Sequence, residues 1–112
     1  MIITEPFLGP QRGHLDIRKI TQDLENLYNQ ALSEFKKILK PDGTIVMLWP
    51  VFMTGRAPQS INPNTSGFKI INPIPGILMS YPLIKLTDRE TIIYGREGQR
   101  VWREIVVLKI VK

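Results

Sequence analysis

The sequence predicts an α/β fold in a single domain that spans residues 1–112. Two observations carry this prediction: a long amphipathic segment, Asp16 to Lys40, and short apolar runs rich in β-branched residues on either side of it. With 112 residues, 43% hydrophobic and 22% charged, the chain can bury an apolar core. Cysteine is absent and His14 is the only histidine, so disulfides and Cys- or His-rich metal sites are excluded.

The segment from Asp16 to Lys40 is expected to form one helix. Its apolar residues recur in steps of three and four along one face, namely Ile17, Ile20, Leu24, Leu27, Tyr28, Ala31, Phe35 and Ile38. Asp16 is placed to cap the amino end. Three lysines in the last turns suit the negative end of the helix dipole, and Pro41-Asp42-Gly43 then stops the helix.

Strands are expected on both sides of this helix. Met1 to Thr4 is a short apolar run, and Thr44 to Trp49 is a continuous apolar run without alternation. Such a run is typical of a strand covered on both faces, as in parallel sheets. Strand, helix, tight turn and strand together indicate a right-handed crossover unit.

The second half of the chain is less regular and then ends in β structure. Six of the nine prolines lie between Pro50 and Pro82, which disfavours a long helix there, although Phe68 to Asn72 could form a short strand. Two β-rich runs, Thr91 to Tyr94 and Val101 to Ile110, are separated by a polar, glycine-containing segment. This pattern predicts a C-terminal antiparallel β-hairpin.

Charge is distributed unevenly. The formal net charge is +5, and residues 51–112, with nine basic and four acidic groups, supply all of the excess. This asymmetry fits a polyanionic partner such as nucleic acid, although five charges also lie within the ordinary solubility range. No apolar run is long enough to cross a membrane and no secretory signal is evident, so we expect a cytoplasmic protein without membrane contact.

The predicted hairpin interleaves cations with aromatic rings, as RNA-binding surfaces do. The cations are Arg96, Arg100 and Arg103, which are candidate nucleic-acid contacts, and the rings are Tyr94 and Trp102. A purely structural hairpin explains the arginines equally well. Strand alternation also groups Trp102 with Glu104, Val106 and Leu108, so its ring could belong to the core.

Three segments of the chain carry a likeness to a known family. The helix is followed by Leu39-Lys40-Pro41-Asp42-Gly43 and an apolar strand. Thr4 to Pro10 stands where the family has an Asp-Pro-Pro-Tyr-like loop, and Tyr94 to Ile105 is similar to its closing segment. Together these segments resemble the C-terminal half of a class I S-adenosylmethionine-dependent methyltransferase, within the RNA methylases similar to tRNA guanine-2-amino methyltransferases.

The resemblance implies a partial Rossmann-like methyltransferase sheet, and a base methyltransferase acting on an exocyclic amine of RNA, with tRNA as the expected substrate. Its catalytic loop would be Thr4, Glu5, Pro6 and Phe7. Phe7 matches the aromatic residue that stacks on the flipped base, and Glu5 or a backbone carbonyl would hold the amine. The match is incomplete, because Thr4 and Glu5 replace the family's acidic or amide residue and its first proline. A plain loop with a surface glutamate is the alternative.

The resemblance implies that the cofactor-binding half of such an enzyme lies outside this sequence. S-adenosylmethionine is the implied cofactor, yet the chain has no Gly-x-Gly loop, so we expect it to be inactive alone. The strand at Met1 to Thr4 would lie at an edge of the sheet with unpaired N–H and C=O groups. This predicts a homo-oligomer or a partner chain that supplies the missing strands. The alternatives are a non-catalytic RNA-binding or scaffold half-domain and a structural homo-oligomer.

Overall fold

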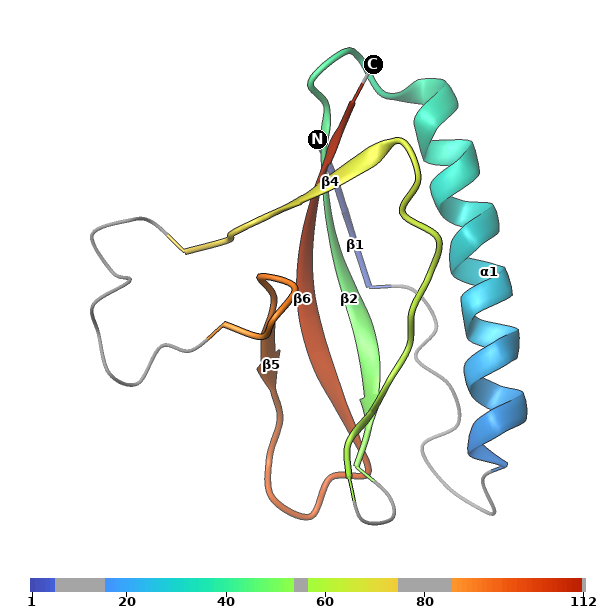
Figure 1. The fold of residues 1–112 in the computed structure, drawn as a ribbon, viewed down its shortest axis with the longest axis vertical. Coiled ribbons are helices and arrows are strands. Elements are labelled where there is room, and N and C mark those ends of the chain that lie inside the picture. Colours follow the sequence, from blue (N-terminus) through green and yellow to red (C-terminus); the bar gives the residue numbers. More distant parts are fainter. Residues whose placement is uncertain (6–15, 54–56, 75–85, 112) are drawn as a thin grey trace.

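The chain folds as one helix packed against a mixed β-sheet (Figure 1). The structure is a computed structural model that describes residues 1–5, 16–53, 57–74 and 86–111. The helix α1 covers Ile17–Ile38, and the described strands are β1 (Ile2–Thr4), β2 (Thr44–Phe52), β3 (Gln59–Ser60), β4 (Phe68–Ile71), β5 (Ile92–Tyr94) and β6 (Val101–Ile110). The predicted α/β class is confirmed.

The ends of α1 follow the sequence signals. The Asp16 side chain accepts a hydrogen bond from the Lys19 backbone N–H at 3.3 Å, which satisfies one of the free donors of the first turn. At the other end the Leu39 N–H bonds to the Phe35 carbonyl at 3.0 Å, and the chain then leaves the helix in an extended conformation. Asp42 takes a positive φ of 63° in the turn that leads into β2.

The sheet has the order β1-β2-β6-β4. β1 and β2 are parallel and are connected through α1, whereas β2 and β6 are antiparallel along nearly their whole length, from Thr44 opposite Lys109 to Phe52 opposite Val101. β4 and β5 both pair antiparallel with β6, and β3 pairs with β2. Among the described strands, β1 therefore lies at an edge of the sheet.

The core lies between α1 and one face of the sheet. Alternate residues of β2 and β6 point to this face and are fully buried, among them Ile45, Met47, Trp49, Val106 and Leu108. Leu24, Tyr28 and Leu32 are the buried residues of α1. The opposite face carries Val46, Leu48, Ile105 and Val107, which are only half-buried, so the predicted coverage of β2 on both faces is incomplete in the described part of the chain.

A segment between β3 and β4 runs beside the helix and is tied to it (Figure 1). The backbone N–H of Asn62 donates to the Glu25 carboxylate at 2.8 Å, and that of Asn64 donates to the Asn29 side chain at 2.6 Å. Ile61, which precedes these residues in the chain, has no exposed surface and belongs to the core. Polar side chains of α1 thus accept hydrogen bonds from backbone N–H groups of a segment that is not paired with a strand.

Candidate functional site

Two predicted functional residues meet at the carboxyl end of β1. Glu5 follows the last residue of β1, and Arg103 lies on β6, where it is opposite Pro50 of β2. The Arg103 Nε donates a hydrogen bond to the Glu5 Oε1 at 2.9 Å, although the two residues are 98 positions apart. The Glu5 side chain is about half exposed and the Arg103 side chain 30% exposed, so the pair lies at the surface and can be reached by a ligand.

The charge of Glu5 also acts on a tyrosine of the helix. Tyr28 of α1 has no exposed surface. Burial raises the pKa of its phenol well above the usual value of 10, and the negative charge of Glu5 raises it further. The phenol therefore keeps its proton at physiological pH. The Glu5 carboxylate therefore contacts the Arg103 guanidinium and also raises the pKa of the Tyr28 phenol.

The other residues of the predicted catalytic loop divide into two groups. Thr4 is the last residue of β1, is half-buried and lies opposite Met47. Pro6 and Phe7 lie outside the described residues, as does His14, so the predicted stacking aromatic remains a prediction. Of the four residues of the predicted catalytic loop, the structure thus describes Thr4 and Glu5.

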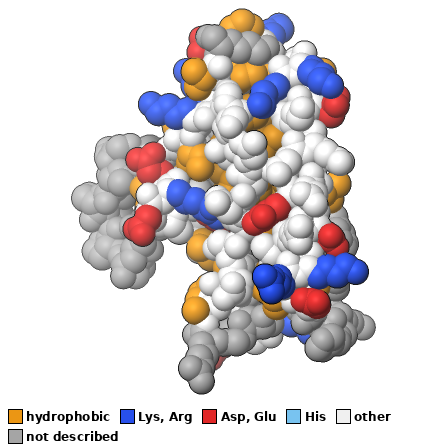
Figure 2. Space-filling view, turned by 45° about the vertical axis from the view of Figure 1, so that its right-hand side comes forward, with side chains coloured by type: hydrophobic (Ala, Val, Ile, Leu, Met, Phe, Trp, Pro, Cys, Tyr) orange, Lys and Arg blue, Asp and Glu red, His pale blue; other side chains and the backbone are white. Residues whose placement is uncertain are grey.

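The predicted RNA-contacting arginines have three different environments. Arg96 is exposed in the segment between β5 and β6, and Arg100 is half-buried immediately before β6. Arg103 already holds Glu5, so a phosphate would have to compete with this carboxylate for its guanidinium. On the face seen in Figure 2, Lys and Arg side chains are interspersed with Asp and Glu, so the described part of this face has no patch of one sign.

A groove lies where β2 ends and β6 begins. It has a volume of about 360 Å³ and is lined by Met53, Glu97, Gly98, Gln99, Arg100 and Trp102. The Met53 N–H donates a hydrogen bond to the Arg100 carbonyl at 2.8 Å, which extends the pairing between β2 and β6 beyond the ends of the two strands. Trp102 is half-buried here, so the expectation that its ring could belong to the core is met only in part.

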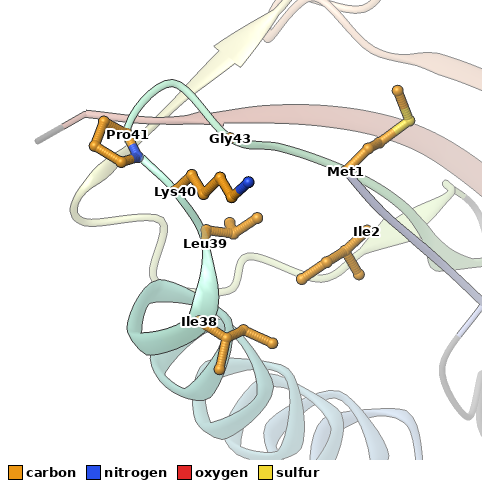
Figure 3. Close-up of a pocket in the computed structure, with 7 residues that line it drawn as sticks. All are labelled: Met1, Ile2, Ile38, Leu39, Lys40, Pro41 and Gly43. Atoms are coloured by element: carbon orange, nitrogen blue, oxygen red, sulfur yellow. The ribbon is translucent and has the colours of Figure 1, made fainter.

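A second groove lies at the opposite end of the parallel strands (Figure 3). It has a volume of about 470 Å³ and is lined by Met1, Ile2, Ile38, Leu39, Lys40, Pro41 and Gly43. Figure 3 shows the Lys40 side chain extending from the turn toward Met1. Ligands of α/β sheets bind at the carboxyl ends of the strands, and this groove is at the amino ends. It is therefore the weaker candidate for a site of chemistry.

A buried ion pair was not predicted. Glu104, 1% exposed, accepts hydrogen bonds from the Arg89 Nε at 2.7 Å and the Arg89 Nη2 at 2.5 Å, and a further one from the Thr91 hydroxyl. Arg89 also donates to the Ile61 carbonyl at 3.0 Å and lies over the Trp49 ring. The signal in the sequence was a glutamate on the same alternating face as Val106 and Leu108, since a buried carboxylate requires a partner.

The glycine-rich loop that typically binds S-adenosylmethionine is not seen at the strand ends that the structure describes. Neither β1 nor β2 is followed by a described glycine, and the groups at the end of β1 are a carboxylate and a guanidinium that are already paired. No cluster of three or more potential metal ligands occurs among the described residues. Within the same described ranges, α1 is too polar to be a membrane-crossing helix.

Comparison of the chain with family models, curated proteins and solved structures finds no match. The family likeness of the three segments therefore has no independent support from these comparisons. Any functional assignment rests on the residues and on their arrangement.

Proposed function

We propose that this chain is the substrate-proximal half of an RNA base methyltransferase that acts on an exocyclic amine, with tRNA as the expected substrate. The observation that carries the proposal is the Glu5–Arg103 pair, which holds a carboxylate at the carboxyl end of a parallel strand. Ligands of open α/β sheets bind at such strand ends. The antiparallel β6 beside β2 also agrees with the closing strands of the family that the sequence resembles.

The chemistry assigned to this chain is recognition and orientation of the target base. A carboxylate accepts N–H bonds from an exocyclic amine and so directs the nitrogen lone pair away from itself. Arg103 limits the positions that the Glu5 side chain can adopt, and the protonated Tyr28 phenol adds no competing negative charge. Phe7 is assigned to stack on the flipped base. S-adenosylmethionine, bound by the polypeptide that supplies the other strands, would provide the methyl group.

Methyl transfer to tRNA tests the proposal, with the chain combined with a polypeptide that supplies the cofactor-binding strands. Glu5→Gln should slow transfer and leave RNA affinity largely unchanged, because it removes the charge near the amine and no phosphate contact. Phe7→Ala should lose on the order of 1–3 kcal/mol of base stacking. Glu34→Gln is the matched control, since Glu34 is an exposed carboxylate of α1 paired with Lys37. If Glu5→Gln and Phe7→Ala both transferred the methyl group at the parental rate, the segment Thr4 to Phe7 would have no catalytic role and would only connect a strand to the helix.

A second candidate function is a non-catalytic RNA-binding or scaffold half-domain that oligomerises or completes a partner chain. It is favoured by the edge position of β1, where Ile3 is 75% exposed, and by the half-buried apolar residues on the sheet face away from α1. Light scattering separates the candidates in part. A stable monomer at tens of micromolar, with no binding of an apolar dye, would count against oligomerisation.

A further inference from the structure

The ring of Trp102 is contacted by the backbone of the segment before it. The indole Nε1 donates a hydrogen bond to the Arg96 carbonyl at 3.1 Å. One face of the ring packs directly on Gly95, where an added Cβ would lie only 2.2 Å from the Trp102 Cγ. Only glycine allows this approach. These two contacts define the orientation of the ring in this structure.

The same ring lines the groove of about 360 Å³ at the carboxyl end of β2. Met53 provides a second apolar wall, and Gly98, with no atom within 4 Å of an added Cβ, leaves the entrance open. The Gln99 side-chain oxygen is used by the Arg96 backbone N–H at 2.9 Å, so its amide N–H groups remain as donors. The groove thus combines an aromatic surface with a few polar groups, an arrangement that suits a base stacked on one side.

The charges around the groove favour an anionic, planar ligand. The exposed Arg96 precedes the groove in the chain and Arg100 lines it, whereas Arg103 lies on the opposite face of β6 and is paired with Glu5. Of the lining residues, Glu97 is the one acid. Aromatic rings interleaved with arginines stack on unpaired bases while the cations contact the adjacent phosphates. A base inside a duplex is already stacked and presents no free face.

We propose that this groove is a subsite for one unpaired base of single-stranded RNA, with Trp102 as the stacking surface and Arg96 as a phosphate contact. The inference rests on the proposed RNA substrate and adds a contact for a nucleotide other than the one held by Glu5. Trp102 and Arg103 are neighbours on β6, so the groove and the Glu5–Arg103 pair lie at the same end of the sheet, with the two side chains on opposite faces of the strand.

Intrinsic fluorescence tests the proposal, because the chain has two tryptophans and Trp49 is 1% exposed. Titration with a short single-stranded oligoadenylate RNA should quench the emission of Trp102 to saturation. Binding of a dye-labelled copy of the same RNA should weaken about tenfold or more in Trp102→Ala. Trp102→Phe, which keeps an aromatic face, should retain most of the affinity.

Charge variants separate stacking from phosphate contact. Arg96→Gln should weaken binding and lower its salt dependence, because one phosphate contact is lost. Lys37→Gln is the matched control: it also removes one positive charge, from the last turn of α1 at the other end of the molecule (Figure 1). This control should bind as the parent does.

Three results would overturn the subsite. They are unchanged Trp102 emission while the labelled RNA binds, parental affinity in Trp102→Ala, and equal competition by a duplex RNA. Each of them leaves methyl transfer by the reconstituted enzyme intact, so the proposed function would survive. Absence of any RNA binding would refute both proposals. If circular dichroism shows that Trp102→Ala is unfolded, the fluorescence titration of the parent chain still decides whether RNA contacts Trp102.

Discussion

Removing the Arg89 side chain should destabilise the fold strongly. The Glu104 carboxylate is buried and receives two charge-assisted hydrogen bonds from Arg89 and one hydrogen bond from Thr91. Arg89→Ala leaves this carboxylate with the Thr91 hydroxyl alone. Loss of one partner of a buried pair costs about 3–5 kcal/mol, and the 29% exposure of the Arg89 side chain places the expected loss near the lower end, about 3 kcal/mol.

Urea unfolding followed by circular dichroism measures this loss. The free energy of unfolding of a domain is only about 5–15 kcal/mol, so the midpoint should shift visibly. The double variant Arg89→Met with Glu104→Leu should recover most of the stability, because it leaves no buried charge without a partner. A loss of less than about 0.5 kcal/mol in Arg89→Ala would refute the reasoning, since that is the range of an ordinary surface substitution.

Three further outcomes are expected. Asp16→Ala should cost about 1 kcal/mol of unfolding free energy in the same urea assay, because the α1 cap is lost; an unchanged midpoint would show that the cap does not matter. Gly95→Ala should cost about 1–3 kcal/mol and shift the emission of Trp102, because the new Cβ displaces its ring; an unaltered spectrum would contradict this packing. Because the pKa of Tyr28 is higher in the folded state than in the unfolded state, the free energy of unfolding should fall as pH rises above about 10. Tyr28→Phe should make the urea midpoint less dependent on pH in this range. The same pH slope in that variant would exclude Tyr28 as its cause.

Local sequence signals predicted the position of most regular elements. The apolar period of three and four residues, the Asp16 cap and the Pro41-Asp42-Gly43 stop place α1 within two residues of its observed ends, Ile17–Ile38. The run from Val101 to Ile110 coincides with β6. These signals are reliable because helix and strand periods follow from backbone geometry between near neighbours.

The sequence underestimated the length of β2. The apolar run was expected to end at Trp49, before Pro50, yet β2 continues to Phe52. Proline lacks an N–H and is tolerated where the ladder does not need a donor. Pro50 lies beyond Met47, where pairing with β1 ends, and before Val51, where pairing with β3 begins. β3 itself, Gln59–Ser60, is too short and polar to be recognised without its partner.

The candidate site was predicted as separate residues, and its assembly was not. Glu5 and the arginines were chosen for their chemistry, but nothing local indicates that Glu5 bonds to Arg103 rather than standing free. The register of β2 against β6 places Arg103 opposite Pro50 and turns it toward the end of β1. Trp102 could likewise be assigned to the core or to the surface. In the structure its ring packs on Gly95 and is half-buried.

The sequence by itself determined the α/β class, the helix with its caps, the two long strands and the basic character of the second half. Each of these depends on residues within a few positions of one another, whose spacing is dictated by the helix and strand periods. Only the tertiary structure decided which distant groups meet, as Arg89 meets Glu104 and Glu5 meets Arg103. Such contacts depend on strand order and register, and a shift of one residue in β6 would turn Glu104 out of the core and Arg103 into it.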